Sequence, residues 1–325
     1  MRSPPLAASE SPGSPIDLRL VRKFFASPSR SAESDFLRRE VANRMNERLA
    51  LMKIEPRRLL DAGCGEGSDL LMLQDRFVDA HIVGVDASAR MLAAASDKQL
   101  AALSSLNRIL KKIVPGRAGA ALGTKTSLIC ADFAHLPLGH NAVDLLWSNL
   151  ALHWHPQPAL VFAEWKRILR VDGLLMFSCF GPDTFRELRT AFAAADDAPH
   201  VLPFVDMHDF GDMLVDTGFS TPVMDMEIIT VTYECTSKLL ADVRAWGGNP
   251  LMSKRRGLFG KSAWQRVIRT LDQLRRPDGK IPLSFEIIYG HAFRPIPTVT
   301  ADGEKIIRLD FPASKGPGDR GKKRR

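Results

Sequence analysis

The sequence predicts an α/β fold whose parallel sheet binds a nucleoside cofactor. Residues 57–67, RRLLDAGCGEG, form an apolar run that ends in an acid and three glycines at two-residue spacing. Residues 82–86, IVGVD, form a second apolar run that ends in an acid, beyond a short helical segment. Strand, glycine loop, helix, strand and acid in this order are typical of folds that bind a nucleoside at the carboxyl ends of parallel strands.

The glycine loop indicates the kind of ligand. Gly63, Gly65 and Gly67 allow a tight turn and let the backbone approach a ligand closely. Asp86 can accept hydrogen bonds from both hydroxyls of a ribose. Because Ser68 stands where a dinucleotide fingerprint has its third glycine, we expect a nucleoside cofactor other than NAD.

The composition is that of a folded protein with short tails. The 325 residues are 45% hydrophobic, which suffices for one large core or a core with a cap. No apolar run approaches the ~20 residues of a membrane span. Residues 1–15 are rich in Pro and Ser and lack the apolar segment of a signal peptide, so we expect a disordered tail on a cytoplasmic protein.

The four cysteines are far apart and have no C-x-x-C spacing. We expect reduced side chains, no zinc site and no other metal centre. Cys64 lies in the glycine loop, where a small residue fits and where its backbone can face the cofactor. The cysteines are Cys64, Cys130, Cys179 and Cys235.

The net charge of +8 is concentrated at the carboxyl terminus. Six Lys or Arg and one Asp after residue 314 account for +5 of it, so residues 314–325 are expected to form a basic disordered tail. No other feature of the sequence indicates a nucleic-acid partner. We expect a monomer.

Residues 16–56 are expected to form a helical cap before the first strand. Ser34 can cap a helix with one apolar stripe, and such a helix would cover the cofactor. The stripe consists of Leu37, Val41, Met45, Leu49 and Met52.

The pattern D-x-G-x-G-x-G at residues 61–67 resembles motif I of the class I S-adenosylmethionine (SAM) methyltransferases. Four later segments resemble further parts of this family in the right order, so that the likeness covers residues 57–180. These are the second motif, the adenine-binding segment, the fourth strand with its loop, and the fifth strand, at residues 86–92, 131–138, 141–154 and 169–178. The resemblance implies a SAM-binding core over residues 57–181.

The same resemblance implies a seven-stranded Rossmann-like sheet in the order 3-2-1-4-5-7-6, with helical inserts that form a substrate lid over residues 182–313. Residues 223–233 and 281–293 are the expected antiparallel edge strands, and residues 236–280 the helical insert between them. Apolar spacing predicts further helices in the long 93–126 insertion, over Phe185, Leu188 and Phe192 after the fifth strand, and before Gly218.

The resemblance also implies a role for each residue of the cofactor site. Asp61 suits the ammonium group of SAM, and the backbone of residues 63–67 suits its amino-acid moiety. Asp86 and Ala87 suit the ribose. The adenine end is assigned to Asp132, Phe133 and Met91, and the methyl end to Ser148, Asn149 and Leu150.

A sulfonium methyl group is already activated, so its transfer needs mainly alignment and exclusion of water. A general base is required only if the nucleophile carries a proton. His153 could orient or deprotonate a nucleophile, or it could simply pack against the next helix. His155 is interpreted as a packing residue.

Beyond residue 180 the chain resembles two related groups. The first is the malonyl-acyl-carrier-protein O-methyltransferases of biotin synthesis, through residues 150–154, 191–204 and 282–290. Ala32 stands where these enzymes have a tyrosine. The second is the methyltransferase-like assembly factor of respiratory complex I, through residues 34–41 and 180–188.

The resemblance to the malonyl-acyl-carrier-protein O-methyltransferases implies a cation that orients the substrate carboxylate. A guanidinium group can pair with a carboxylate bidentately. Arg186, Arg255 and Arg256 are the candidates, and Tyr289 of the last strand joins the catalytic set. A basic stretch in the lid could steer an acidic acyl carrier protein. It consists of Lys254, Arg255, Arg256, Lys261 and Arg266.

Two functions remain open at this point. The protein is a methyltransferase that acts on a malonyl group of an acyl carrier protein, or it binds SAM and serves as an assembly factor that modifies or chaperones a protein partner. The sequence does not name the methyl acceptor.

Overall fold

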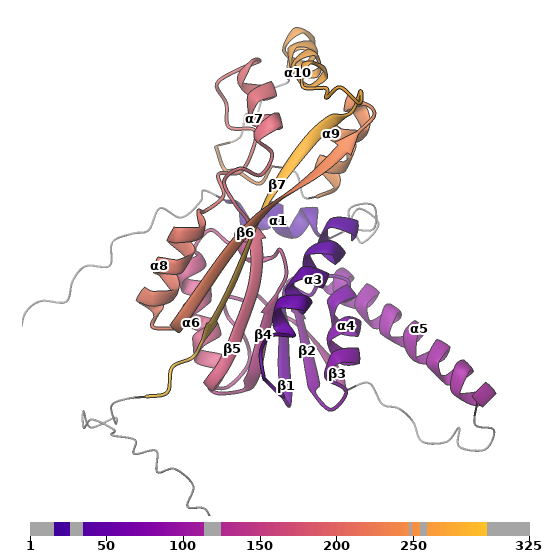
Figure 1. Ribbon diagram of the computed structural model, residues 1–325, viewed down its shortest axis with the longest axis vertical. Helices are drawn as coiled ribbons and strands as arrows, with labels where there is room; N and C mark the ends of the chain where they lie inside the picture. Colours follow the sequence, from indigo (N-terminus) through magenta and orange to yellow (C-terminus); the bar gives the residue numbers. More distant parts are fainter. Residues whose placement is uncertain (1–15, 27–34, 114–124, 247–248, 254–258, 298–325) are drawn as a thin grey trace, which may run out of the picture.

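A computed structural model describes residues 16–26, 35–113, 125–246, 249–253 and 259–297, and for residues 103–113 it describes the backbone alone (Figure 1). Both predicted tails lie outside the described residues. The same holds for the predicted helix cap Ser34, for Ala32, and for Lys254, Arg255 and Arg256 of the basic stretch.

The structure confirms the predicted sheet: seven strands in the order β3-β2-β1-β4-β5-β7-β6. β1 to β5 are parallel, and β7 pairs antiparallel with both β5 and β6. The strands are β1 Arg58–Ala62, β2 His81–Asp86, β3 Thr126–Cys130, β4 Val143–Ser148, β5 Leu169–Phe180, β6 Ser220–Tyr233 and β7 Ile281–Phe293.

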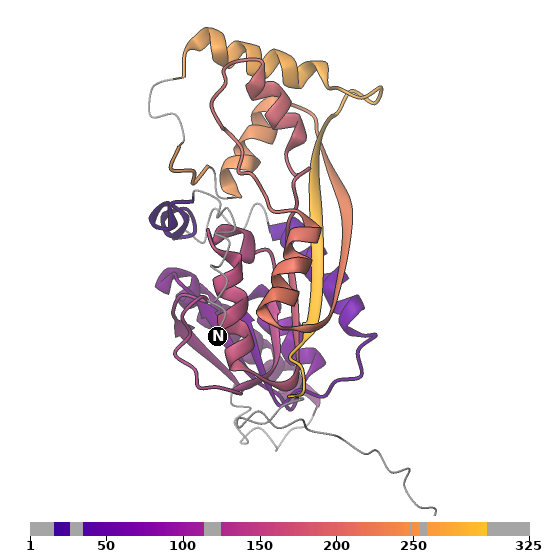
Figure 2. The ribbon, with the colours of Figure 1, turned by 90° about the vertical axis from the view of Figure 1, so that its left-hand side faces the viewer.

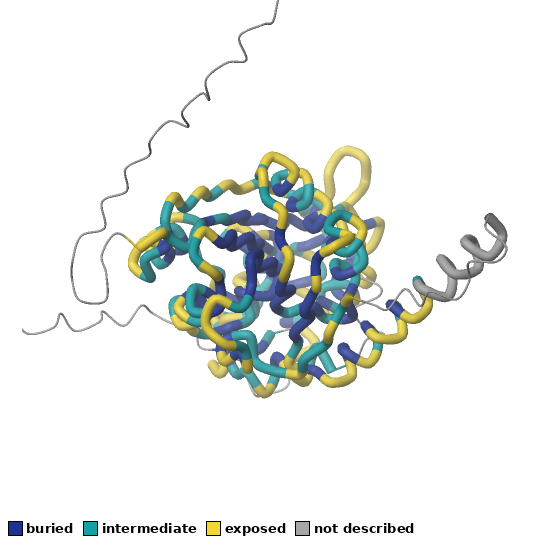
Figure 3. Tube along the Cα trace, turned by 90° about the horizontal axis from the view of Figure 1, so that it is seen from below, coloured by how far each residue is buried: buried dark blue, intermediate teal, exposed yellow. Residues whose placement is uncertain are grey.

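Helices cover both faces of the sheet, which explains why the central strands are continuous apolar runs. Consecutive residues point to opposite faces: Leu59 joins the core on the side of α3 and α4, whereas Leu60 joins the core on the side of α6 and α8. Seen along the strands, the buried residues lie inside and the exposed residues on the rim (Figure 3). The helices are α1 Leu18–Phe24, α3 Asp35–Leu49, α4 Ser68–Arg76, α5 Ala89–Ile113, α6 Pro158–Ile168, α7 Arg186–Ala193, α8 Met207–Thr217, α9 Thr236–Ala245 and α10 Lys261–Gln273, with a 3-10 turn η1 at Leu152–Trp154.

The predicted apolar stripe on α3 is present, but it packs on the sheet. Leu37, Val41, Met45 and Leu49 are at most 1% exposed within the core of that face. The cover over the carboxyl ends of the strands comes from α1. The expectation that the α3 helix covers the cofactor is therefore corrected: α3 contributes Arg38 there, and α1 contributes a row of side chains.

Two predicted helices have different bounds in the structure. The helix expected inside the 93–126 insertion is the continuation of α5, which runs unbroken for 25 residues from Ala89 and projects from the domain (Figure 1). The helix after strand five begins at Arg186 and not at Phe185, because Phe185 has a left-handed φ of 61° and so cannot be a helical residue. The end of α8 agrees with expectation, with Gly218 at a φ of 82°.

Beyond the parallel strands, α7, α9 and α10 gather around the extended β6 and β7 (Figures 1 and 2). Their apolar side chains continue the core of the α3 face, through residues such as Leu240, Val267 and Phe285. The Arg266 guanidinium of α10 donates to the Ala194 and Ala195 carbonyls at the end of α7, at 3.2 and 3.0 Å. We call the set of α7, α9 and α10 the lid.

Candidate functional site

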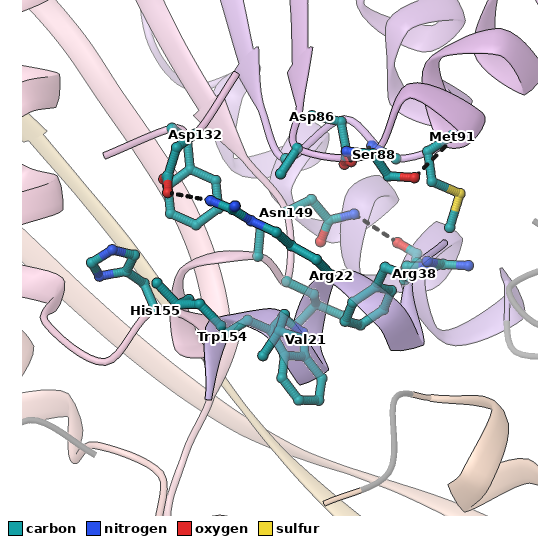
Figure 4. A pocket seen from close by; sticks show the side chains of 18 residues that line it. Val21, Arg22, Arg38, Asp86, Ser88, Met91, Asp132, Asn149, Trp154 and His155 are labelled. Atoms are coloured by element: carbon teal, nitrogen blue, oxygen red, sulfur yellow. Dashed lines mark hydrogen bonds and ion pairs between the residues drawn. The ribbon is translucent and has the colours of Figure 1, made fainter. Parts of the chain in front are cut away.

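A pocket of about 120 Å³ lies at the carboxyl ends of β1, β2 and β4, beside the point where the strand order reverses. It is shown in Figure 4. Side chains from α1 close one side and the glycine loop forms another. The lining residues are Leu18, Val21, Arg22, Phe25, Arg38, Gly63, Gly65, Asp86, Ala87, Ser88, Met91, Asp132, Phe133, Asn149, Leu150, Ala151, Trp154 and His155.

The glycine loop can only be built with glycine where it approaches the pocket. Gly63 has a φ of 82°, and a Cβ atom there would lie 2.4 Å from the Cβ of Ala151, which also lines the pocket. Gly67 has a φ of 75° at the start of α4, where a Cβ atom would lie 2.8 Å from the Cβ of Ala95. A side chain at Gly63 would close the space that the loop leaves for a ligand.

Asp86 fixes the loop and faces the pocket at once. Its carboxylate accepts the Gly65 N–H at 3.0 Å and the Ser88 N–H at 2.8 Å. Burial raises the pKa of Asp86, while these two hydrogen bonds and nearby Arg38 act to lower it. Each carboxylate oxygen keeps one lone pair that accepts no backbone N–H. These two lone pairs can accept hydrogen bonds from the two hydroxyls of a ribose.

A small acidic recess adjoins the main pocket on the side of α3. Its lining combines carboxylates with one guanidinium group and the glycine loop. The Asp61 side chain is 1% exposed, and its Oδ2 atom has no hydrogen-bond partner among the described residues. Burial raises the pKa of Asp61, and repulsion by Asp69 and Asp86 raises it further. The recess is lined by Asp35, Arg38, Asp61, Gly63, Cys64, Gly65, Glu66, Ser68, Asp69 and Asn149.

This recess fits the amino-acid end of SAM. A buried carboxylate with an unsatisfied oxygen is costly unless a cation meets it, and the ammonium group of SAM is such a cation. Arg38 can pair with the carboxylate of the same moiety. Sequence reasoning missed Arg38 and Asp69, since neither belongs to a local motif that marks a ligand, and it missed Glu66 because only the backbone was assigned a role at that position of the glycine motif.

The side chain of Asn149 is held by its neighbours rather than directed freely at a substrate. Its Nδ2 donates to the Asp69 Oδ2 and to the Arg38 carbonyl, both at 3.0 Å. Its Oδ1 accepts the Ser178 hydroxyl at 2.9 Å. The Ser148 hydroxyl is wholly buried and donates to the Ala62 carbonyl at 2.8 Å, so Ser148 does not line the pocket.

The opposite end of the pocket contains the residues assigned to the adenine. Met91, Asp132 and Phe133 all line it, as do Asp86 and Ala87. Figure 4 shows Arg22 of α1 reaching across to Asp132, and the two groups lie 3.1 Å apart. Sequence reasoning missed Arg22 because 110 residues separate it from its partner.

The two histidines after β4 have different surroundings. His153 is packed among the rings of Trp154, Phe180 and Phe204, and its Nδ1 accepts the Phe180 N–H at 3.3 Å. Burial lowers the pKa of His153 to about 3, so the ring is neutral in ordinary buffers. His155 lines the pocket, its Nδ1 accepts the Gln157 N–H at 3.1 Å, and burial lowers its pKa.

Like Ser148 and His153, two further residues of the expected catalytic set do not line the pocket. The Arg186 side chain is half exposed and lies 3.3 Å from Glu187 and 4.0 Å from Asp183, away from the pocket lining. The Tyr289 ring lies under the Arg48 guanidinium of α3, 3.9 Å from ring centroid to Cζ, and burial raises the pKa of Tyr289.

Gly67, which the sequence assigned to the cofactor site, does not line the pocket. Its left-handed backbone determines the conformation of the loop at the start of α4.

A narrow space of about 40 Å³, here called the passage, adjoins the pocket on the side of α9. It shares Phe25, Arg38, Leu150 and Trp154 with the pocket. Leu150 has a left-handed φ of 50°, and its N–H donates to the Ser178 Oγ at 3.0 Å.

Comparison with known proteins agrees with this geometry. Residues 60–177 match the sequence family described as "Methyltransferase domain". The malonyl-[acyl-carrier protein] O-methyltransferase of Gallionella capsiferriformans is 41% identical over 91% of this chain and 97% of the relative. The enzyme of the same name from Laribacter hongkongensis is 45% identical over 80% of this chain and 83% of the relative.

Solved structures agree in fold. The YcgJ protein from Bacillus subtilis superposes with a TM-score of 0.52 at 13% identity, covering 78% of this chain and 98% of that one. At that identity the likeness concerns the fold alone.

No helix among the described residues has the length and apolar character needed to cross a membrane.

Proposed function

We propose that this chain, which belongs to the family of malonyl-[acyl-carrier protein] O-methyltransferases, transfers a methyl group from SAM to the free carboxylate of a malonyl group on an acyl carrier protein. The family and the use of SAM follow from the relatives. The methyl acceptor is the proposed part. The observation that carries it is the combination of those relatives with a cofactor pocket that opens toward the lid.

The residues of the site suit this reaction. When bound, SAM supplies a methyl group on a positively charged sulfur, which needs no further activation. A carboxylate is already a nucleophile, so no general base is required. This agrees with His153, whose pKa of about 3 makes it a poor base and whose neighbours are aromatic rings.

Each part of the pocket then has one task. The recess around Asp61 binds the ammonium group of SAM, and the loop at Gly63 leaves room for its amino-acid moiety. Asp86 and Asp132 bind the polar groups of the nucleoside. Val21 and Phe25 of α1 help to keep water from the reacting atoms. Leu150 and Trp154, on the shared wall, align the incoming acyl group.

An acidic carrier protein would meet the lid first. Lys238 of α9 and Lys261 and Arg269 of α10 are exposed there. Positive charge on this surface supports association with an acidic partner, and the rate of association should fall as salt is added.

The proposal is tested by transfer of a radiolabelled methyl group from SAM to a malonyl-carrier, with an acetyl-carrier as the control. We expect label on the malonyl-carrier alone, and growth without biotin when the gene replaces a deleted biotin-pathway methyltransferase. A protein that binds SAM but labels neither carrier would refute the proposal. It would favour the assembly-factor alternative, which requires SAM binding without this transfer.

A further inference from the structure

A second cavity, of about 230 Å³, lies inside the lid. Aromatic and aliphatic side chains from the end of β5, from α7, α9 and α10 and from the segment after α7 form its walls. The Phe185 and Trp246 rings stack at a centroid distance of 6.1 Å on one side. The lining residues are Trp154, Phe180, Phe185, Leu188, Phe192, His200, Val201, Leu202, Phe204, Leu240, Val243, Arg244, Trp246, Asn249 and Trp264.

This lid cavity has an inner end at the cofactor pocket. Trp154, Phe180 and Trp246 line both the cavity and the narrow passage, and Trp154 also lines the cofactor pocket. The cavity, the passage and the cofactor pocket therefore adjoin one another around Trp154.

An exposed part of the cavity wall carries a positive charge. Among the described lining residues, Arg244 is the only Lys, Arg, Asp or Glu, and it is exposed whereas Leu240 and Trp246 of the same wall are buried. Its guanidinium lies 5.9 Å from the centroid of Trp264. None of the ion pairs between described residues involves Arg244.

The other polar groups of the cavity wall are already engaged. Asn249 donates to the Pro199 carbonyl at 3.0 Å and accepts the Leu251 N–H at 2.9 Å. His200 lies 2.6 Å from Asp196 and stacks on Phe192 at 4.2 Å. These contacts hold the segment after α7 against the lid and leave Arg244 as the described charge that can meet a ligand.

We infer that the lid cavity binds the 4′-phosphopantetheine arm of the thioester substrate and that Arg244 binds the phosphate of that arm. The inference rests on the proposed function and names a subsite for it. The cavity wall offers each chemical group of this ligand a suitable contact. The acyl carboxylate enters the passage, the methylenes and paired methyl groups of the arm contact the aromatic walls, and the anionic phosphate reaches the exposed guanidinium.

Binding of the arm alone provides a test that does not depend on turnover. Three of the five tryptophans, Trp154, Trp246 and Trp264, line the cavity, so their fluorescence should change when it is filled. The full-length protein, saturated with the demethylated product of SAM, is titrated with 4′-phosphopantetheine and with pantetheine. We expect phosphopantetheine to bind roughly tenfold more tightly, the order of a charge-assisted bidentate contact.

The substitution Arg244→Gln should remove that tenfold preference and leave pantetheine binding unchanged. Arg276→Gln, which removes an equal charge from the exposed turn between α10 and β7, should keep the preference. Val201→Phe, which fills the cavity, should weaken both ligands without changing SAM affinity. A preference that survives Arg244→Gln, or equal binding of both ligands by the unchanged protein, would overturn the inference.

Kinetics separate this inference from the proposed function. Arg244→Gln should raise KM for the malonyl-carrier roughly tenfold with little change in kcat, and should not affect a malonyl thioester of N-acetylcysteamine, which lacks the phosphate. Coenzyme A carries the same arm, so the ratio of KM values for malonyl-coenzyme A and malonyl-carrier identifies the natural source. Phosphate-dependent binding without methyl transfer would retain the subsite and reject the proposed reaction.

Discussion

The Arg22 guanidinium of α1 lies 3.1 Å from the Asp132 carboxylate, across the end of the pocket that the sequence assigns to the adenine. Both residues line the pocket. The helix that carries Arg22 is tied to the lid side by Ile16, which bridges to Leu251, and by the Asp17 N–H, which donates to the Pro250 carbonyl at 2.9 Å. The same short helix therefore contacts both the cofactor site and the segment that follows α9.

Replacement of Arg22 by Gln tests whether SAM and Arg22 compete for Asp132. The Arg22 side chain is 52% exposed, so the ion pair contributes at most about 1 kcal/mol and the melting temperature should change little. If the adenine amino group takes over Asp132, SAM should bind up to about fivefold more tightly to Arg22→Gln, by calorimetry at low salt. Arg19→Gln on the exposed side of α1 is the control. Weaker SAM binding by Arg22→Gln would show that the guanidinium instead assists the cofactor.

Replacement of Asp61 by Asn should raise the stability of the ligand-free protein and lower its affinity for SAM. The raised pKa means that the ionised carboxylate is unfavourable in the ligand-free fold, so Asp61→Asn should raise the melting temperature without ligand. The variant should lose at least about tenfold in SAM affinity, because the ammonium group loses its charged partner. Calorimetry and thermal unfolding check both effects.

The raised pKa of Asp61 also determines how the stability of the ligand-free protein changes with pH. A carboxyl group whose pKa is higher in the folded than in the unfolded chain adds stability at acid pH, and this is lost as pH rises through the folded-state pKa. Ligand-free stability should thus decline with rising pH in that range less in Asp61→Asn than in the unchanged protein. The control Asp144→Asn, which loses the negative charge that pairs with Arg170 at 3.1 Å and receives the Arg57 and Arg58 N–H groups, should lower stability but leave SAM affinity intact.

Replacement of His153 by Asn should keep the acceptor for the Phe180 N–H and remove the titrating ring. Because the pKa of about 3 lies below the unfolded value near 6.5, the unfolded chain takes up the proton first, and folded stability falls as pH drops from 6.5 toward 3. The melting temperature of His153→Asn should therefore fall less between pH 7.5 and 5. Its pH profile for methyl transfer should match that of the unchanged protein, and a lost turnover with normal SAM affinity would reveal a chemical role.

Replacement of Gly63 by Ala should abolish SAM binding and destabilise the fold. The left-handed backbone alone costs about 1–2 kcal/mol for an alanine, and the new methyl would stand 2.4 Å from the Ala151 Cβ. Gly139→Ala is the matched control, since its Cβ would meet no atom within 4 Å. Equal SAM affinity in the two variants would exclude close approach of the cofactor to Gly63.

The sequence by itself determined which apolar runs form the central strands, the position of the glycine loop and the acids near the ends of β1 and β2, whereas the strand order was implied by the family resemblance. These features depend on local patterns: apolar runs that form buried strands, glycines that allow a left-handed turn, and an acid at a strand end. The bounds of β7 and the left-handed Gly218 follow from similarly short patterns. Each is set by interactions among residues close in sequence, so a single chain carries enough information to predict them.

Only the tertiary structure decided which side chains meet at the site. The sequence could not pair Arg22 with Asp132, collect Asp61, Asp69 and Arg38 in one recess, or place Tyr289 under Arg48, because these contacts join separate elements. The same holds for the lid cavity with Arg244 in its wall. Such contacts arise when helix and sheet faces pack at a particular register, and packing depends on the complementary shape of distant segments rather than on any local pattern.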